Sequence, residues 1–375
     1  MAVLPVMFGF FIMGFVDIIG MTTNYIKADF TDLNDTMANL LAVSCFVWFL
    51  IFSVPTGMLM NRIGRKRTVL LSFLVQIVAF ALVLVEYSYT IVMVAFSLVG
   101  IGNTILQVAL NPLVTNEASK EKLTGTPTLG QFTKAICSFT GPILVGWFAG
   151  MAFGWKLIFP VYAAVSLLGF IWLALTPIKE EQAKGASVSF ADTFKLFKDK
   201  YILAFFVAIL VLVGVDVGMN ITFPKFLQES AGLDVTEAGL GNSVYCFART
   251  IGAFVVGIIL MTLSAFRFYR VSIILGLLGL VAMLFSQNLW MSLVCVSLFG
   301  LGYSNLFAII FSLAMKRMPE RTNEVSALLI MGVSGGGVLP PVMGVITATA
   351  GSQWAAILVL AVVWIALFSM PVPDT

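Results

Sequence analysis

Long apolar stretches alternate with short polar segments along almost the whole chain of 375 residues. A helix needs about 20 consecutive apolar residues to cross the hydrocarbon core of a bilayer. Since backbone N–H and C=O groups find no water there, such stretches are expected to be helical. The pattern predicts twelve membrane-spanning helices, over residues 3–26, 37–60, 68–86, 89–115, 126–149, 156–176, 202–228, 236–263, 269–286, 289–315, 323–349 and 352–371.

The longest polar interruption divides these twelve helices into two sets of six. It covers residues 177–200 and contains five Lys residues. We therefore predict an all-α polytopic membrane protein with an N-terminal six-helix bundle over residues 1–176 and a C-terminal six-helix bundle over residues 201–375. Residues 177–200 are predicted to form a cytoplasmic linker between the two bundles.

Short motifs of the first half return in the second half at an offset near 200. The tripeptide Gly-Ile-Gly at 100–102 returns as Gly-Leu-Gly at 300–302, and Gly57 returns as Gly257. Internal repeats of this kind are typical of duplicated transporter folds. The repeat predicts that the two bundles are related by pseudo-symmetry.

Composition excludes most other classes of protein. Only 10% of the residues are charged, whereas a soluble domain carries roughly 25%. The chain has no His, and its four Cys residues lie in apolar stretches without CxxC spacing, so we expect no metal, no cofactor and no disulfide framework. No segment combines a nucleophile, a base and an orienting group, which argues against an enzyme. A net charge of +3 gives no reason to expect nucleic-acid binding.

The distribution of Lys and Arg predicts the orientation in the membrane. Sixteen of the 21 basic residues fall in the even-numbered connections between predicted helices, and basic residues concentrate on the cytoplasmic side. We expect a multi-pass protein of the cell membrane with both termini cytoplasmic and no cleavable signal peptide. One chain with twelve spans suffices for a transporter, so a monomer is expected.

Four charged residues lie near the middle of predicted spans, where a charge costs several kcal/mol unless it is paired or hydrated. They are Asp17, Lys134, Asp216 and Arg249. One interpretation is two structural ion pairs, Asp17 with Lys134 and Asp216 with Arg249. The other is that one pair exchanges a proton during transport. Because Arg stays protonated, we predict that Asp17 and Lys134 are the proton-coupling residues.

Polar side chains recur three or four residues apart on several of the same helices, which places them on one helix face. They can act as hydrogen-bonding contacts between helices, or they can converge on a central cavity that binds a polyhydroxylated solute. We favour the cavity. The predicted substrate-binding residues are Asn24, Gln107, Asn111, Gln131, Asp216, Asn220, Tyr245 and Arg249.

A glycine-rich and basic segment joins the second and third predicted helices. It contains Gly57, Arg62, Gly64, Arg65 and Lys66, and basic clusters of this kind lie beside the anionic cytoplasmic leaflet. The segment resembles the loop signature of the major facilitator superfamily. In that signature an Asp usually stands where this chain has an Asn at position 61.

Other motifs resemble the fucose-proton symporter branch of that superfamily. They are Ile310-Phe311-Ser312-Leu313, Lys316, Ile330-Met331, Gly335-Gly336-Gly337, Pro341-Val342-Met343-Gly344, Asn111-Pro112 and Gln131. The resemblance implies a two-bundle fold that works by alternating access, with a sugar site between the bundles. The chain also departs from this branch at several positions. The symporters carry a membrane-embedded Glu where this chain has Gln107, an uncharged amide where it has Lys134, and their first-helix acid one turn beyond Asp17.

The predicted function is secondary active uptake of a small hydrophilic solute, most simply a monosaccharide, by symport with a proton. Three alternatives remain open. Gly141-Pro142 with Gly146 resembles part of an antiporter motif, which would favour proton-coupled efflux of amphipathic drugs. Loss of a titratable group at Gln107 would suit an uncoupled sugar uniporter. The cations Lys134 and Arg249 would suit an anionic sugar derivative.

Overall fold

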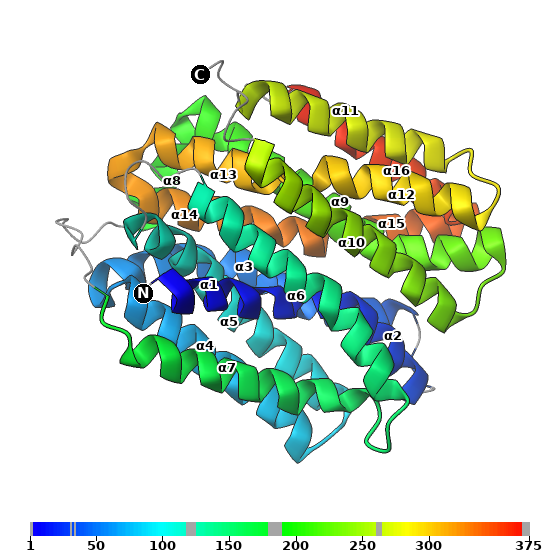
Figure 1. The fold of residues 1–375 in the computed structure, drawn as a ribbon, viewed down its shortest axis with the longest axis horizontal. Coiled ribbons are helices and arrows are strands. Elements are labelled where there is room, and N and C mark those ends of the chain that lie inside the picture. Colours follow the sequence, from blue (N-terminus) through cyan, green and yellow to red (C-terminus); the bar gives the residue numbers. More distant parts are fainter. Residues whose placement is uncertain are drawn as a thin grey trace.

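The computed structural model describes residues 3–30, 32–33, 35–117, 125–178, 190–259 and 265–369, and it is all-helical in these ranges. Helices occupy all twelve predicted positions and run roughly along one direction, with the chain termini at one end (Figure 1). Nine of the described helical segments are long and apolar enough to cross a membrane. The other three positions are filled by α10, α11 and α16. The predicted fold class is therefore confirmed.

The described residues of the first half form seven α-helices and two 3₁₀ segments. Their bounds are α1 (Val3–Met13), η1 (Gly14–Ile18), α2 (Ile19–Asp29), α3 (Asp35–Ile63), α4 (Arg65–Val85), α5 (Tyr89–Glu117), α6 (Gly125–Ala149), η3 (Trp155–Leu157) and α7 (Ile158–Leu175).

The second half follows a short connecting segment. Its bounds are α8 (Phe190–Phe194), η4 (Lys195–Lys198), α9 (Lys200–Ala231), α10 (Val235–Ile259), α11 (Ala265–Met283), α12 (Leu289–Tyr303), α13 (Leu306–Arg317), η5 (Pro319–Arg321), α14 (Thr322–Met331), η6 (Gly332–Ser334), α15 (Gly335–Ala350), α16 (Trp354–Ile365) and η7 (Ala366–Ser369). Residues 179–189 of the predicted linker lie outside the described residues, and the predicted bundle boundaries stay a prediction.

Among the residues that the structure describes, three predicted spans are interrupted part of the way along. The first changes from α to 3₁₀ geometry over Gly14–Ile18, the tenth breaks at Ser304 and Asn305, and the eleventh contains a 3₁₀ turn over Gly332–Ser334. At Gly14 a Cβ atom would lie 2.7 Å from the Cβ of Cys137 and 2.9 Å from the carbonyl oxygen of Lys134. Because a glycine stands there, the first span approaches α6 closely, and this brings Asp17 toward Lys134.

Glycine contacts confirm the internal repeat. Gly100 on α5 packs against the backbone carbonyl of Cys45 on α3, and Gly300 on α12 packs against the backbone carbonyl of Tyr245 on α10. Both members of the second contact lie 200 residues after their counterparts. The pair Gly102 and Ser72 likewise returns as Gly302 and Ser272. The two halves therefore use the same helix-packing contacts at equivalent positions.

The two halves meet along helix pairs from opposite halves. In Figure 1, α6 runs beside α10, and the Thr250 hydroxyl of α10 donates to the Ala135 carbonyl of α6 at 3.1 Å. On the other side of the interface, Gly336 and Gly337 of α15 pack against Phe46 of α3. The interface therefore flanks a central region into which η1 and α9 also project.

Candidate functional site

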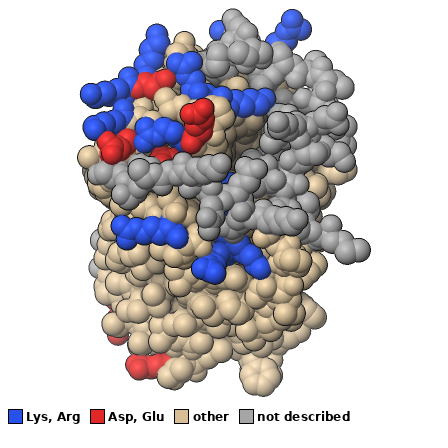
Figure 2. Space-filling model, turned by 90° about the vertical axis from the view of Figure 1, so that its left-hand side faces the viewer, with Lys and Arg blue, Asp and Glu red and all other residues tan. Residues whose placement is uncertain are grey.

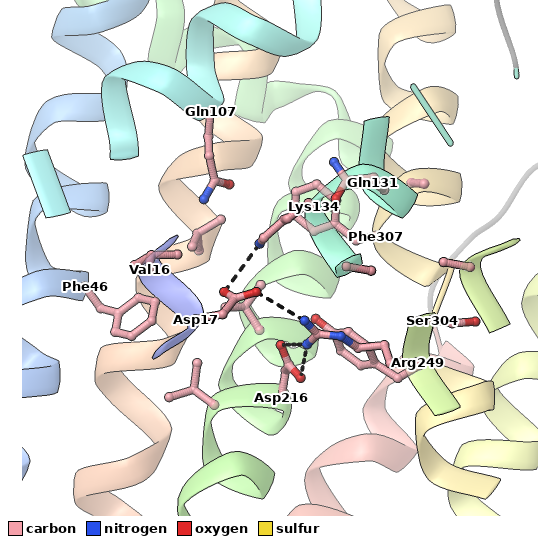
Figure 3. Close-up of a pocket in the computed structure, with 17 residues that line it drawn as sticks. Val16, Asp17, Phe46, Gln107, Gln131, Lys134, Asp216, Arg249, Ser304 and Phe307 are labelled. Carbon is pink, nitrogen blue, oxygen red and sulfur yellow. Dashed lines mark hydrogen bonds and ion pairs between the residues drawn. The ribbon is translucent and has the colours of Figure 1, made fainter. Parts of the chain in front are cut away.

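The four intramembrane charges predicted from the sequence meet at the centre of the molecule. Asp17 lies on η1, Lys134 on α6, Asp216 on α9 and Arg249 on α10. Figure 3 shows Asp17 between Lys134 and Arg249, with Asp216 below Asp17 and facing the same guanidinium group of Arg249. Both predicted ion pairs are present, at 3.6 Å from Lys134 Nζ to Asp17 Oδ1 and 2.7 Å from Arg249 Nη1 to Asp216 Oδ2.

Asp216 is held by several donors. Arg249 Nη1 donates to both of its carboxylate oxygens at 2.7 Å. The Tyr245 hydroxyl, which is fully buried, also donates to Asp216 Oδ1, and the Asn220 amide donates to it at 3.3 Å. Charge-assisted hydrogen bonds are the strongest kind in proteins. These contacts hold the carboxylate of Asp216 firmly against Arg249.

Asp17 is held less firmly and joins the two halves. Arg249 Nη2 of the second half reaches its Oδ2 atom at 3.2 Å, and the Ser138 hydroxyl donates to the same atom. The Asp17 side chain is 22% exposed, against 13% for Asp216 and 9% for Arg249. The sequence predicted one ion pair within each half, but it did not predict this bridge between the halves.

A cavity of about 70 Å³ lies against these charges, several times the ~10–15 Å³ that a single water molecule occupies on the same measure. Its charged wall is formed by Asp17, Lys134, Asp216 and Arg249. The remaining lining residues are Val16, Phe46, Gln107, Gln131, Ala135, Val213, Val217, Ala253, Tyr303, Ser304, Phe307, Ala308 and Val333. Both halves of the chain therefore contribute to one chamber that combines charges, amides and aromatic rings.

Three predicted substrate-binding residues whose side chains the structure describes do not line this cavity. Asn111 is buried one turn away from Gln107 and donates to its carbonyl oxygen at 2.8 Å. Asn220 and Tyr245 stand behind Asp216 and hydrogen-bond to it. The side chain of Asn24 lies outside the described residues. These three side chains lie behind the residues that line the cavity. The donor of Asn111 is used by the helix backbone, and those of Asn220 and Tyr245 are used by Asp216.

The sequence interpretation missed three polar or aromatic lining residues of the second half, Tyr303, Ser304 and Phe307. The internal repeat contained a signal for them. Phe307 lies 200 residues after Gln107, which lines the cavity, and Tyr303 lies 200 after Asn103, which accepts a hydrogen bond from Gln107 at 2.7 Å. Applying the offset to the polar stripe of the fourth span would have found Tyr303 and Phe307, but not Ser304.

The glycine-rich segment lies at one end of the interface between halves. Arg65 at the start of α4 donates to the Asn323 amide oxygen at 3.0 Å, to the Thr322 hydroxyl at 3.2 Å and to the Pro112 carbonyl at 3.0 Å. Asn323 in turn donates to the side chain of Asn61 at 2.6 Å. These residues come from α3, α4, α5 and α14, so this end of the molecule is closed by polar contacts.

The other residues of this segment have distinct positions. Gly57 faces α14, where a Cβ would lie 2.9 Å from the Cβ of Ala327. Gly64 lies at the turn between α3 and α4 and has a φ of 89°, a backbone conformation that favours glycine. Lys66 donates to the last carbonyls of α7, and Arg62 is exposed. The segment therefore binds α14 and α7 and presents only part of its charge to solvent.

The end face that carries this segment is rich in basic residues. Figure 2 shows Lys and Arg side chains spread over this face, with acidic side chains beside some of them. Exposed members are Arg62, Arg67, Lys195, Lys198, Lys200, Lys316 and Arg317. We call this face the basic end.

Comparison with known proteins places the chain in a family. The family profile described as Major Facilitator Superfamily matches residues 6–339 and residues 208–375. The chain is 25% identical to a protein of Brucella abortus named glucose/galactose transporter, over 96% of this chain and 91% of the relative. It is 24% identical to a probable nitrate transporter, NarT, of Staphylococcus epidermidis, over 83% of this chain and 80% of the relative.

Solved structures show the same fold. The E. coli fucose:proton symporter FucP superposes with a TM-score of 0.79 and 18% identity, over 98% of this chain and 96% of that one. A structure of FucP in the outward conformation gives a TM-score of 0.80, over 98% of both chains. With the family match over most of its length, this chain belongs to the major facilitator superfamily and is a multi-pass membrane transporter, not an enzyme.

Proposed function

We propose that this protein takes up a small hydrophilic solute, a monosaccharide or related sugar, by symport with a proton and alternating access. One observation carries the proposal: a cavity built by both halves is bordered by a carboxylate, Asp17, that binds cations from both halves. A proton on Asp17 removes the negative charge that holds Arg249 and Lys134. Protonation thus changes the contacts between the halves, which is what coupling to alternating access requires.

Asp17 suits the proton-carrying role better than Asp216. The carboxylate of Asp216 accepts two hydrogen bonds from Arg249 and others from Tyr245 and Asn220. Asp17 has longer ion-pair contacts, of 3.2 and 3.6 Å, and its side chain is more exposed to the cavity. A proton therefore reaches Asp17 with a smaller loss of interactions.

The cavity lining supports a sugar as the solute. Gln107 and Gln131 offer amide donors and acceptors, and Phe46 and Phe307 offer apolar rings beside them. Binding sites for small molecules commonly combine aromatic walls with a few placed polar groups. The glucose/galactose and fucose transporters among the similar proteins agree with this solute class.

We further propose that the basic end faces the cytoplasm, as the positive-inside rule requires. Both termini would then be cytoplasmic, and the closed contacts of Arg65 and Asn323 would seal the cytoplasmic side. The similarity to FucP in the outward conformation supports this assignment. Because one chain supplies both halves of the cavity, a monomer is sufficient.

The proposal is tested by uptake of radiolabelled sugars into proteoliposomes with and without an inward proton gradient. The native protein should accumulate its sugar only with the gradient. Asp17→Asn should retain sugar exchange across the membrane but lose gradient-driven accumulation. The exposed Asp32→Asn serves as the matched control and should behave like the native protein.

Three results would contradict the proposal. Accumulation that Asp17→Asn leaves undiminished would remove Asp17 from the coupling role. Equilibration without accumulation in the native protein would identify a uniporter, and solute extrusion driven by the gradient would identify an antiporter.

A further inference from the structure

The charges around the cavity balance in the state that the structure shows. In the described part of the chain, the ionisable groups that line it are Asp17, Asp216, Lys134 and Arg249, apart from the phenol of Tyr303. Two carboxylates face two cations, so the cluster is neutral. A buried group of charges is costly when one charge lacks a partner. The cluster is therefore most stable when its total charge remains zero.

Protonation of Asp17 leaves an excess of one positive charge. Arg249 still has a carboxylate partner, because it keeps both hydrogen bonds to Asp216 at 2.7 Å. Lys134 loses its ion-pair partner, since its ammonium group contacts Asp17 Oδ1 at 3.6 Å. The Ser138 hydroxyl, which also faces Asp17, carries no charge. The uncompensated cation is therefore the ammonium group of Lys134.

Lys134 borders the cavity, and its side chain is 21% exposed. Gln131 lies nearly one helical turn before it on α6, and Gln107 faces the same space from α5 (Figure 3). An ammonium group with amide donors beside it is well suited to bind a carboxylate. A solute carboxylate at this place would restore neutrality after Asp17 has taken its proton.

We propose that the solute is a sugar acid, a monosaccharide with one carboxylate that binds Lys134 in place of Asp17 and enters with one proton. This inference rests on the proposed function and specifies its substrate class. Solute and proton together then carry no net charge. Transport of the sugar acid is driven by the pH gradient and is insensitive to the membrane potential. A neutral sugar that enters with one proton would instead carry one positive charge inward.

Matched probes test this directly. Glucuronate and galacturonate differ from glucose and galactose only in a carboxylate in place of the terminal CH₂OH group. Uptake of each into proteoliposomes is measured with a proton gradient, at zero potential and with a potassium-diffusion potential. We expect hexuronate uptake to be at least about tenfold more efficient than hexose uptake, since hydrogen bonds to charged groups are stronger than those between neutral groups. Hexuronate uptake should be equal at both potentials.

Variants add a second readout. Lys134→Gln should raise the hexuronate concentration for half-maximal binding by about tenfold or more, and Lys134→Arg should recover part of the loss. Lys198→Gln removes a cation from the exposed basic end and should leave hexuronate binding unchanged.

The outcomes separate this inference from the proposed function. Hexose uptake equal to or better than hexuronate uptake, with a dependence on membrane potential, overturns the sugar-acid assignment while the proposed sugar symport holds. Failure of the proton gradient to drive accumulation of any of the four probes overturns the proposed function and this inference with it.

Discussion

Arg249 makes direct contacts with two carboxylates that belong to different halves of the chain. It binds Asp216 through two hydrogen bonds of 2.7 Å and Asp17 through one contact of 3.2 Å. The guanidinium group suits this arrangement because it presents several donors in a fixed plane. Lys at this position would lack the geometry to hold both acids. At the scale of single residues, the ionic bridge between the acids of the two halves depends on this one side chain.

Asp216→Asn is predicted to destabilise the protein markedly. It leaves Arg249, which is 9% exposed, with one carboxylate instead of two, and removing one partner of a buried ion pair costs about 3 kcal/mol or more. The thermal unfolding temperature in detergent measures the effect. The exposed Asp32→Asn is the control and should change it little. Equal unfolding temperatures for both variants would mean that Asp216 does not hold Arg249.

The sequence was sufficient to identify these charges, because an ionisable residue in the middle of an apolar span is conspicuous. It was also sufficient to pair Asp17 with Lys134 within one half. It was not sufficient to predict the bridge from Asp17 to Arg249. That contact depends on how the two halves are placed relative to each other, and helical spacing within a span carries no information about this placement.

Close contacts between helices depend on individual glycines. The backbone of α5 lies directly against the carbonyl of Cys45 on α3 at Gly100, where a Cβ atom would overlap that carbonyl. Small residues allow such approach in membrane proteins, where dispersion contacts between helices replace a hydrophobic driving force.

Gly100→Ala is predicted to destabilise the protein by about 1–3 kcal/mol, the usual cost of overpacking. Gly146→Ala on α6 is the matched control, because no atom lies within 4 Å of its added Cβ. That control should be neutral or slightly stabilising, since Ala favours a helix over Gly by up to about 1 kcal/mol. Unfolding temperatures of the two variants in the same detergent measure the difference, and a stable Gly100→Ala protein would contradict the contact.

A second prediction concerns the start of α9. Asp199 accepts hydrogen bonds from the backbone N–H groups of Tyr201 and Ile202, and the Arg317 guanidinium donates to it at 3.0 and 3.1 Å. Burial raises the pKa of Asp199, but these donors outweigh burial and hold the pKa below its usual value. Its ionised form therefore stabilises the folded protein above the unfolded pKa of about 3.9.

Asp199→Asn should accordingly lower stability by about 0.5–1 kcal/mol, as expected of a partly exposed ion pair at a helix start. The loss should be constant between about pH 5 and pH 8. It should disappear as the pH falls through the lowered pKa, because the native side chain is then also uncharged. The difference in stability is measured by the unfolding temperatures of both proteins, from neutral pH down through the lowered pKa of Asp199. A loss that varies near neutral pH would contradict the assignment.

The breaks inside spans were not predicted. Hydropathy reports the length of an apolar segment but not whether its backbone keeps α geometry, so residues 3–26 looked like one helix. In the eleventh span the 3₁₀ turn begins at Gly332, and a glycine inside a helix weakens it without any tertiary contact. At Gly14, by contrast, the need for a glycine comes from the approach of Cys137 and Lys134 on α6, and this contact is not visible in the local sequence.

On the scale of the whole molecule, the two halves form a cavity in the middle and closed contacts at the basic end. The sequence repeat was sufficient to predict two similar halves, since helix-packing glycines recur at an offset of 200. The conformational state was not predictable, because alternative states of a transporter use the same sequence. Contacts of α14 with α3, α4 and α5 define the state seen here.

Asn323→Ala is predicted to favour opening of the basic end. The variant loses the hydrogen bonds that Asn323 accepts from Arg65 and donates to Asn61, and a loss of about 1.4 kcal/mol changes a two-state ratio about tenfold. Ser326→Cys provides the reporter, since Ser326 is buried in this interface and donates to the Val108 carbonyl at 3.0 Å. Labelling of the cysteine by a hydrophilic maleimide should become several-fold faster.

Asn288→Ala in the same reporter protein is the control. It removes a side-chain cap at the start of α12 without touching the Arg65 contacts, and its labelling rate should match that of the reporter alone. Equal rates in all three proteins would show that Asn323 does not hold the basic end closed.

The 3₁₀ segment over Gly14–Ile18 determines how the first span is able to move. A 3₁₀ helix turns about 120° and rises about 2.0 Å per residue, whereas an α-helix turns about 100° and rises about 1.5 Å. Rewinding five residues from one form to the other therefore rotates α2 against α1 by roughly 100° and shortens the span by about 2.5 Å. Asp17 lies inside this segment, so a screw movement of the backbone would swing its carboxylate around the helix axis and away from its present neighbours.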